Sequence, residues 1–479
     1  MKPILCLTTL LFSVATVSAQ VSPERIRAIL QQEVKAKRSM NIIVGIIDAN
    51  GQQVIAEGVL SDKNPIPPDS NTVYEIGSVT KVFTSLLLAQ MSMNHQLNLS
   101  DPIARFLPPA VKSPRRNETE ITLLSLATHR SGFPRNAYNL DPQNPDNPFT
   151  DYSLAQLHAF VSGVQLNRDI DSRWQYSNIG YTLLGQILAS AGHKAYEDLV
   201  LEKICAPLKL SNTWFSTPKG QNPSIAPGYT EYGKPAAAWD LLPLAGGGGL
   251  RSTVKDMLRF AAANMGMVPS ELQAAMDLCH ELQSKKDGTD EYMSLGWTIN
   301  KAEGREIVYK DGGTGGYRSF LGIDKRHQRA VVVLCNSNNG VTDIGLHLLD
   351  SNLRLKPYHY PWSLLDTLRN TMEQKGLAAG LALYRKLKAS GNEAFLFNEH
   401  QLNQLGNEWR KAQKIQGAIK IYELNLHEYP RSAMVYESLA ETYRHNGQKQ
   451  KAIPYLEQAQ KLEPDNQRWT WLLRQLRGS

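Results

Sequence analysis

The chain has 479 residues, of which 42% are hydrophobic and 20% are charged, and its formal net charge is +7. This composition is that of a globular protein and excludes the disordered, collagen-like and disulfide-miniprotein classes. The basic excess is thinly spread, so we expect no nucleic-acid partner. The length predicts one large domain and a second, smaller one.

Residues 1–19 have the pattern of a secretory signal peptide. A lysine at position 2 precedes an apolar run, and Val17-Ser18-Ala19 supplies the small residues of a signal-peptidase site. We expect cleavage before Gln20 and export across the cytoplasmic membrane; an uncleaved N-terminal anchor is the alternative. No later apolar run in the sequence has the length of a membrane-spanning helix.

The cysteines do not form the pattern of a disulfide framework. Cys6 leaves with the predicted signal peptide, and an odd number remains, Cys205, Cys279 and Cys335, scattered over a long chain. The adjacent Cys279 and His280 have no second pair at ligand spacing. We therefore expect no disulfide, no metal and no other cofactor.

The pattern of residues 20–355 predicts one α/β (α+β) domain. A helical segment precedes two strands in a hairpin, and three further short strands lie near the end of this range. Between them, residues 80–282 are mostly helical in periodicity, with loops rich in Pro, Asn and Gly. We expect an antiparallel sheet flanked by helices, with a mostly helical subdomain. The predicted strands are 42–47, 54–56, 307–309, 317–323 and 330–334.

The C-terminal part contains an internal repeat. Residues 399–432 and 433–466 superimpose with a period of 34 residues, and they carry the small, aromatic and proline positions of tetratricopeptide helix pairs. Asn425 stands where the second copy has a small apolar residue. Because two repeats cannot bury their own faces, we expect a helical connector at 356–398 and a capping helix at 467–479. This all-α tail either binds a protein or peptide partner or is a structural appendage docked on the first domain.

The first chemical motif is Ser78-Val79-Thr80-Lys81, at the start of an apolar helical segment. Spacing by three residues places the hydroxyl and the amine on one helix face, about 5–6 Å apart at Cβ. A serine needs a base to act as a nucleophile, and a lysine can be that base when burial and nearby cations lower its pKa. The backbone N–H of Ser78, at a helix N-terminus, can also stabilise an oxyanion.

Two further segments complement this pair. Tyr176-Ser177-Asn178 offers a phenol that can relay a proton to a leaving group and an amide that can brace a lysine or bind a substrate carbonyl. Lys310-Asp311-Gly312-Gly313 ends a predicted strand with a cation and with glycines that allow close backbone approach. The N–H of Gly313 can complete an oxyanion hole.

These three segments, in this order, resemble those of the serine β-lactamases and penicillin-binding proteins. The Tyr-x-Asn element is similar to that of class C β-lactamases, D-alanyl-D-alanine carboxypeptidases and their esterase and D-aminopeptidase relatives. The stretches 121–132 and 247–253 also look like that family, and the resemblance covers roughly residues 22–350. It implies a β-lactamase/transpeptidase-like fold and a location in the bacterial periplasm.

The resemblance also implies an acyl-enzyme mechanism. Its residues have four roles: nucleophile (Ser78), proton transfer (Lys81 and Tyr176), substrate binding (Asn178, Lys310, Asp311 and Gly312), and oxyanion hole (the amides of Ser78 and Gly313). His129 has no part in this scheme, and we interpret it as a structural loop histidine.

Asp311 departs from the family pattern, in which a threonine hydroxyl helps to bind a substrate carboxylate. A carboxylate side chain in that place is expected to repel such a substrate. The main hypothesis is an exported serine hydrolase that cleaves β-lactam or D-alanyl-D-alanine-type amide bonds, in a small molecule or a peptidoglycan peptide. The alternatives are an esterase or D-amino-acid amidase whose substrate lacks a free carboxylate, and a non-catalytic binding protein that acts through its repeats.

Overall fold

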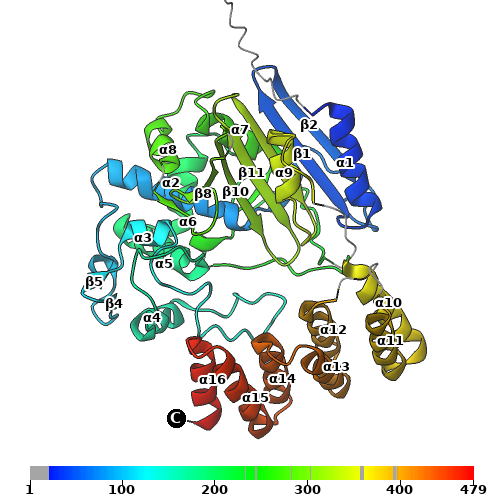
Figure 1. Ribbon diagram of the computed structural model, residues 1–479. Coiled ribbons are helices and arrows are strands. Elements are labelled where there is room, and N and C mark those ends of the chain that lie inside the picture. Colours follow the sequence, from blue (N-terminus) through cyan, green and yellow to red (C-terminus); the bar gives the residue numbers. More distant parts are fainter. Residues whose placement is uncertain are drawn as a thin grey trace, which may run out of the picture.

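The computed structural model describes residues 21–231, 233–242, 245–281, 283–302, 304–356, 361–391, 395 and 397–478. The chain forms a sheet domain, within residues 21–356, and a helical array, within residues 361–478 (Figure 1). The predicted signal peptide, residues 1–19, lies outside the described residues.

An eight-stranded sheet, in which every neighbouring pair is antiparallel, forms the centre of the sheet domain. The predicted antiparallel sheet, with strands from both ends of the domain, is confirmed. The three short strands β7, β8 and β9 were not predicted. In spatial order the strands are β2 (Gly51–Gly58), β1 (Asn41–Asp48), β12 (Arg329–Cys335), β11 (Arg318–Asp324), β10 (Ile307–Gly313), β9 (Thr298–Asn300), β8 (Glu291–Met293) and β7 (Ser284–Lys285).

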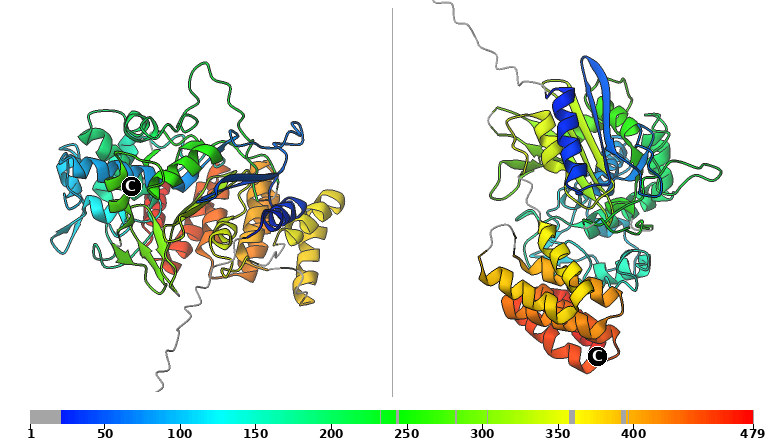
Figure 2. Two further views of the ribbon diagram at one scale, coloured as in Figure 1. Left: turned by 90° about the horizontal axis from the view of Figure 1, so that it is seen from above. Right: turned by 90° about the vertical axis from the view of Figure 1, so that its right-hand side faces the viewer.

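Helices cover both faces of the central strands, which explains their unbroken apolar runs (Figures 1 and 2). Ile42 belongs to the core beneath α1 (Pro23–Lys35) and α9 (Thr342–Leu349), whereas Ile43 belongs to the core on the opposite face. On that face α7 (Val254–Asn264) approaches β1 closely. A Cβ at Gly45 would lie 2.6 Å from side-chain atoms of α7, so this glycine permits the contact.

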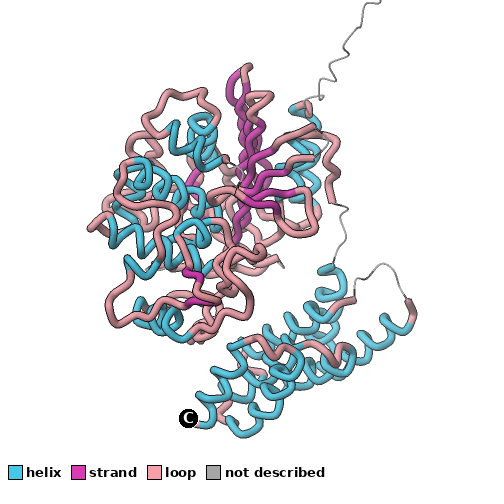
Figure 3. The backbone as a smooth tube through the Cα atoms, turned by 60° about the vertical axis from the view of Figure 1, so that its left-hand side comes forward, coloured by secondary structure: helices cyan, strands magenta, loops and turns pink. Residues whose placement is uncertain are grey.

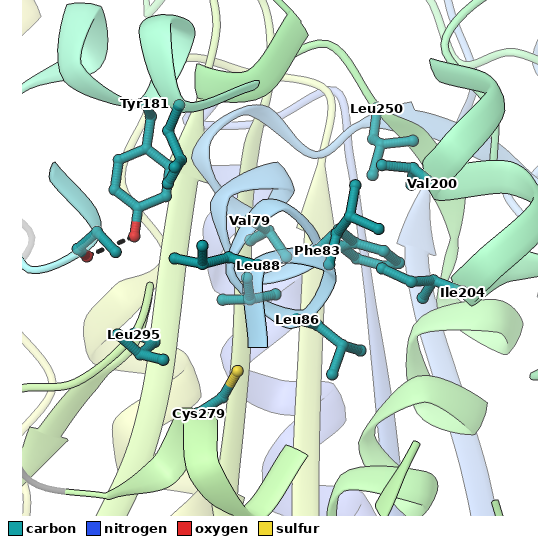
Figure 4. Close-up of a cluster of buried hydrophobic side chains, with 14 of the residues drawn as sticks. Val79, Phe83, Leu86, Leu88, Tyr181, Val200, Ile204, Leu250, Cys279 and Leu295 are labelled. Atoms are coloured by element: carbon teal, nitrogen blue, oxygen red, sulfur yellow. Dashed lines mark hydrogen bonds between the residues drawn. The ribbon is translucent and has the colours of Figure 1, made fainter. Parts of the chain in front are cut away.

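The helical subdomain is built around α2 (Thr80–Met93), whose residues are buried on almost all sides. Figure 4 shows side chains of this helix, among them Phe83 and Leu88, meeting Tyr181, Ile204 and Leu250 in one apolar cluster. Phe83 also stacks on Phe260, with ring centroids 4.3 Å apart. The other α-helices of this region are α3 (Leu123–Ala127), α4 (Leu154–Gly163), α5 (Asn178–Ala191), α6 (Tyr196–Val200) and α8 (Gln273–His280).

The helical array places its helices side by side (Figures 1 and 3), and the predicted all-α tail is confirmed. The two predicted repeats correspond to the pairs α12–α13 and α14–α15. Asn425 is fully buried, and its amide nitrogen donates to the carbonyl oxygen of Glu399 at 2.8 Å. The helices are α10 (Pro361–Lys375), α11 (Leu377–Ala389), α12 (Glu399–Lys411), α13 (Ile415–Glu428), α14 (Ala433–His445), α15 (Lys449–Leu462) and α16 (Gln467–Arg477).

Both ends of the array are covered by further helices. The pair α10–α11 shares an apolar core with α12 and α13, in which Leu368 and Tyr384 meet Leu402. At the other end Trp469 and Leu472 of α16 join the core of α14 and α15. The two repeats are thus flanked by helices on each side, as a stack of this kind requires.

Three further observations concern the described residues only. None of their helices combines the length and the apolar character needed to cross a membrane. The thiols of Cys205, Cys279 and Cys335 are free and buried. Within the same ranges no three His, Cys, Asp or Glu side chains are grouped as ligands for a metal ion.

Strand β10 runs close to the segment that precedes α2. A Cβ on Gly312 would lie 2.1 Å from the carbonyl oxygen of Ile76 and 3.0 Å from the backbone nitrogen of Ser78. On the other side of this contact, Gly77 has a φ of +48°, and its missing side chain leaves room for the backbone of Gly313. The glycines therefore allow two backbones to lie in contact where side chains would separate them.

We predict that Gly312→Ala destabilises the sheet domain by about 1–3 kcal/mol, because the added methyl group meets backbone atoms of Ile76 and Ser78 as well as the hydroxyl of Ser319. The measurement is urea unfolding followed by circular dichroism. Gly340→Ala is the matched control, since a Cβ there meets no atom within 4 Å, and it is expected to be neutral or slightly stabilising. Equal midpoints for the two variants would contradict the close approach of β10.

Candidate active site

Ser78 lies in a tight turn between a short strand and a long helix. Strand β3 (Val73–Glu75), paired with β6 (Arg251–Thr253), ends just before the 3₁₀ turn η1 (Gly77–Val79), and α2 follows directly. The positive φ of Gly77 turns the chain at this point. The serine is therefore presented at the start of α2, facing the end of β10.

The Ser78 hydroxyl is in contact with two of the predicted catalytic groups. The ammonium group of Lys81 donates to Ser78 Oγ at 3.1 Å, and the Tyr176 hydroxyl donates to the same oxygen at 2.7 Å. Lys81 Nζ also donates to Asn178 Oδ1 at 3.0 Å and to the carbonyl oxygen of Gly247. The structure thus brings together Ser78 and Lys81, from one helix turn, with Tyr176 and Asn178, from the second motif.

The electrostatics of Lys81 follow from its burial, since its side chain is fully buried. Burial is the main cause that lowers the pKa of Lys81 to about 8, and the positive charge of Lys310 lowers it further, whereas Tyr176 opposes the shift. Burial also lowers the pKa of Lys310. A fraction of Lys81 is therefore neutral near neutral pH and able to accept a proton.

Tyr176 is surrounded by cations and held by a buried histidine. Lys81 Nζ, Lys310 Nζ and Arg135 Cζ each lie 5.0 Å from the centroid of its ring. The ring of His129 packs against it at 4.5 Å, and His129 Nδ1 accepts the backbone N–H of Ser177 at 3.1 Å. Burial, aided by the nearby cations, holds the pKa of His129 well below its usual range. His129 therefore supports Tyr176 as a neutral imidazole.

The segment 176–178 is shaped by the start of a helix. Ser177 is the N-cap of α5, and its hydroxyl accepts the N–H of Gly180 at 3.0 Å, which places Asn178 in the first turn. The amide of Asn178 donates to Asn136 Oδ1 at 3.1 Å while its oxygen accepts from Lys81. Because both ends of this amide are bonded, its orientation is fixed.

Alternation along β10 separates the residues of the third motif. Lys310 is buried beside Tyr176, and Gly312 contacts the Ser78 segment, whereas Asp311 is exposed and accepts a hydrogen bond from Thr342 Oγ1 at 3.2 Å. Asp311 does not line the cavity in front of Ser78. The structure therefore gives no support to Asp311 as a substrate-binding residue, and the expected repulsion of a substrate carboxylate loses its geometric basis.

A cavity of about 320 Å³ opens in front of Ser78. Ser78 and Gly313, the two residues predicted for the oxyanion hole, both line it. Asn178 lines it too, whereas Lys81, Tyr176 and Lys310 are not among the residues that line it. Two cations, Arg135 and Arg318, face the cavity, and an apolar wall is formed by Leu140, Phe149, Tyr152, Trp239 and Leu241.

Most of the residues that line this cavity were not identified from the sequence. Arg135, Leu140, Phe149 and Trp239 lie in irregular segments between the named elements, so neither a periodic pattern nor a recognised motif marks them. Arg318, the first residue of β11, also faces the cavity. Its Nε donates to the carbonyl oxygen of Asn338 at 3.2 Å, which holds the guanidinium beside Gly313.

Comparisons with known proteins agree with this arrangement. A family model described as Beta-lactamase matches residues 26–350, and one described as Tetratricopeptide repeat matches residues 433–466. The D-alanyl-D-alanine-carboxypeptidase/endopeptidase AmpH of Escherichia coli (strain K12) is 28% identical over 321 residues, which cover 62% of this chain and 82% of that protein. A β-lactamase of Pseudomonas fluorescens is 27% identical over 359 residues, covering 68% of this chain and 95% of that protein.

A solved structure, the octameric penicillin-binding protein homologue from Pyrococcus abyssi, has the same fold. The TM-score is 0.62 at 22% identity, and the match covers 72% of this chain and 81% of that one. The Beta-lactamase model extends over more than half of the chain and includes all the motif residues described above. The chain therefore belongs to the β-lactamase family.

Proposed function

We propose that this protein is an exported serine hydrolase that forms an acyl-enzyme at Ser78 and cleaves β-lactam or D-alanyl-D-alanine-type amide bonds. The observation that carries the proposal is the Ser78 hydroxyl itself, which borders a cavity and is in hydrogen-bond contact with both Lys81 and Tyr176. The name of the relative AmpH supports the peptide substrate class. Export to the bacterial periplasm is part of the proposal and rests on the sequence of residues 1–19.

The geometry supports a two-step reaction. Ser78 Oγ attacks the substrate carbonyl carbon while neutral Lys81 accepts the hydroxyl proton, and the amides of Ser78 and Gly313 stabilise the negative oxygen. The amide C–N bond then breaks, and the leaving nitrogen takes a proton delivered through Tyr176. Water attacks the resulting ester, the acid is released and the Ser78 hydroxyl is restored.

Lys81 gives this reaction a defined dependence on pH. Below its pKa of about 8 the lysine is protonated and cannot accept the Ser78 proton. We predict that kcat/KM for an aryl ester rises with pH and levels off above about pH 8. Lys310→Met should move this transition to higher pH, because it removes a positive charge that lowers the pKa of Lys81. A pH profile that the substitution leaves unchanged would contradict the electrostatic coupling of the two lysines.

Labelling with a fluorescent penicillin tests the nucleophile and the substrate class together. We predict covalent labelling of the wild type, loss of labelling in Ser78→Ala, and unchanged labelling in Ser92→Ala, a serine at the far end of the same helix. Reaction with a generic fluorophosphonate alone would retain the serine hydrolase and reject the β-lactam substrate. Reaction with neither probe would reject the catalytic proposal as a whole.

Arg318 is the residue that we expect to bind a substrate carboxylate, because it faces the cavity beside Gly313. We predict that Arg318→Gln lowers kcat/KM for a penicillin or a D-alanyl-D-alanine peptide by 10- to 100-fold, roughly 1.4–2.7 kcal/mol, and changes a neutral aryl ester by less than about threefold. Asp311→Asn, outside the cavity, should change both substrate kinds by the same factor. Equal losses for both substrates in Arg318→Gln would rule out carboxylate recognition by this arginine.

A further inference from the structure

The helical array holds a loop of the sheet domain, residues 139–150, by charged contacts. Arg444 of α14 donates to both carboxylate oxygens of Asp141, at 2.9 and 2.6 Å. Arg468 of α16 donates to the carbonyl oxygen of Leu140 at 2.5 Å. Lys411 of α12 forms an ion pair with Asp146. Helices α12, α14 and α16 therefore all contact one short segment.

Arg468 is held by acidic residues of the array, and Arg444 is largely buried where it contacts the loop. The Nε of Arg468 donates to Glu437 at 2.6 Å and its Nη2 donates to Glu441 at 2.9 Å, which fixes the guanidinium. The side chains of Arg444 and Asp141 are only 19% and 20% exposed. A bidentate, largely buried pair is stronger and more specific in geometry than an exposed ion pair.

A comparison of the two repeats shows that the loop replaces an internal partner. Arg410 and Arg444 are 34 residues apart and occupy the same position in successive repeats. Nη1 of Arg410 lies 3.8 Å from Oε2 of Glu441, which is a residue of the array itself. The carboxylate bound by Arg444 belongs instead to Asp141 of the loop. The loop thus provides a contact that the array makes internally one repeat earlier.

The opposite side of the same loop forms part of the Ser78 cavity. Leu140 and Phe149 line the cavity, and the ring of Phe149 packs edge-on against Trp239 with centroids 5.2 Å apart. Asn147 Oδ1 accepts the backbone N–H of Asp240 at 3.0 Å. Leu140 is therefore both a wall residue of the cavity and the direct neighbour of Asp141, which pairs with Arg444.

The middle part of the loop has few side chains that could hold it in this position. The first residue of the loop, Asn139, accepts a hydrogen bond at Oδ1 from the hydroxyl of Tyr152 at 2.7 Å, and near its end Phe149 packs against Trp239. Between these anchors residues 141–148 are Asp, Pro, Gln, Asn, Pro, Asp, Asn and Pro, without one large apolar side chain. A segment of this composition cannot form a core of its own and depends on contacts with its neighbours.

We infer that the ligand of the helical array is this loop of the same chain, and that Arg444 and Arg468 are positioning residues for the apolar wall of the Ser78 cavity. The inference rests on the proposed function in one respect: the wall receives the acyl side chain of the substrate. Release of the loop moves Leu140 and Phe149 and weakens the binding of bulky apolar acyl groups, while the Ser78, Lys81 and Tyr176 contacts are unchanged.

The test compares Arg444→Ala, Asp141→Ala and the double variant, in the full-length protein, on 4-nitrophenyl phenylacetate and 4-nitrophenyl acetate. Each single variant is expected to raise KM for the phenylacetate about tenfold with little change in kcat, and to leave the acetate within about twofold. The double variant should be no worse than either single one, because all three remove the same contact. Arg477→Ala is the matched control, since Arg477 of α16 pairs with Glu457 inside the array.

Hydrogen exchange of residues 139–150, measured by mass spectrometry, provides a readout that needs no turnover. Exchange should accelerate in Arg444→Ala and Asp141→Ala and not in Arg477→Ala. Unchanged exchange, or an equal loss of activity on both esters, would overturn the inference. Absence of fluorophosphonate labelling in the wild type would instead reject the proposed function, and the exchange comparison would still decide whether the array holds the loop.

Discussion

The burial of Lys81 is the constraint on which the rest of the site depends. A buried ammonium group is stable only when its N–H groups find acceptors, and the acceptors here come from segments far apart in the sequence. Ser78 lies one helix turn away, Asn178 begins α5, and Gly247 precedes β6. The hydrogen bonds of this one cation therefore fix the relative positions of α2, α5 and the glycine-rich segment before β6. Ser78, the proposed nucleophile, is placed as part of the same arrangement.

The same burial also changes the protonation state of Lys81. An exposed lysine with a pKa near 10.4 is neutral in roughly one molecule in 2,500 at pH 7, whereas a pKa of about 8 makes roughly one in ten neutral. The desolvation that makes this residue costly to bury thus raises the population of neutral Lys81 by more than two orders of magnitude. Lys310, on β10, contributes to the lowered pKa of Lys81, so this strand affects Lys81 as well as the backbone of Ser78.

The sequence predicted those parts of the structure that depend on local patterns. Ser78 and Lys81 share one helix turn, the longer strands show as apolar runs, and the repeats have a constant period. Asp311 was assigned to substrate binding from its place in a motif, but side chains alternate along β10, and this one turns to Thr342. The two- and three-residue strands β7 to β9 are too short for a period to be detected. Arg135 and Trp239 lie in irregular loops, and only the tertiary fold brings them to the cavity.

The contact between Arg444 and Asp141 joins residues 303 positions apart and could not be found from either segment alone. Its physical logic is nevertheless visible in the loop sequence. Three prolines reduce the conformational freedom that the loop loses when it is held, and two aspartates supply the charge for cations of the array. On the inference drawn above, the middle of the loop, which has no large apolar side chain, gains its order from contacts with the array. A β-lactamase-type fold in which one wall of the cavity is held in this way has a structural reason to retain a helical array in the same chain.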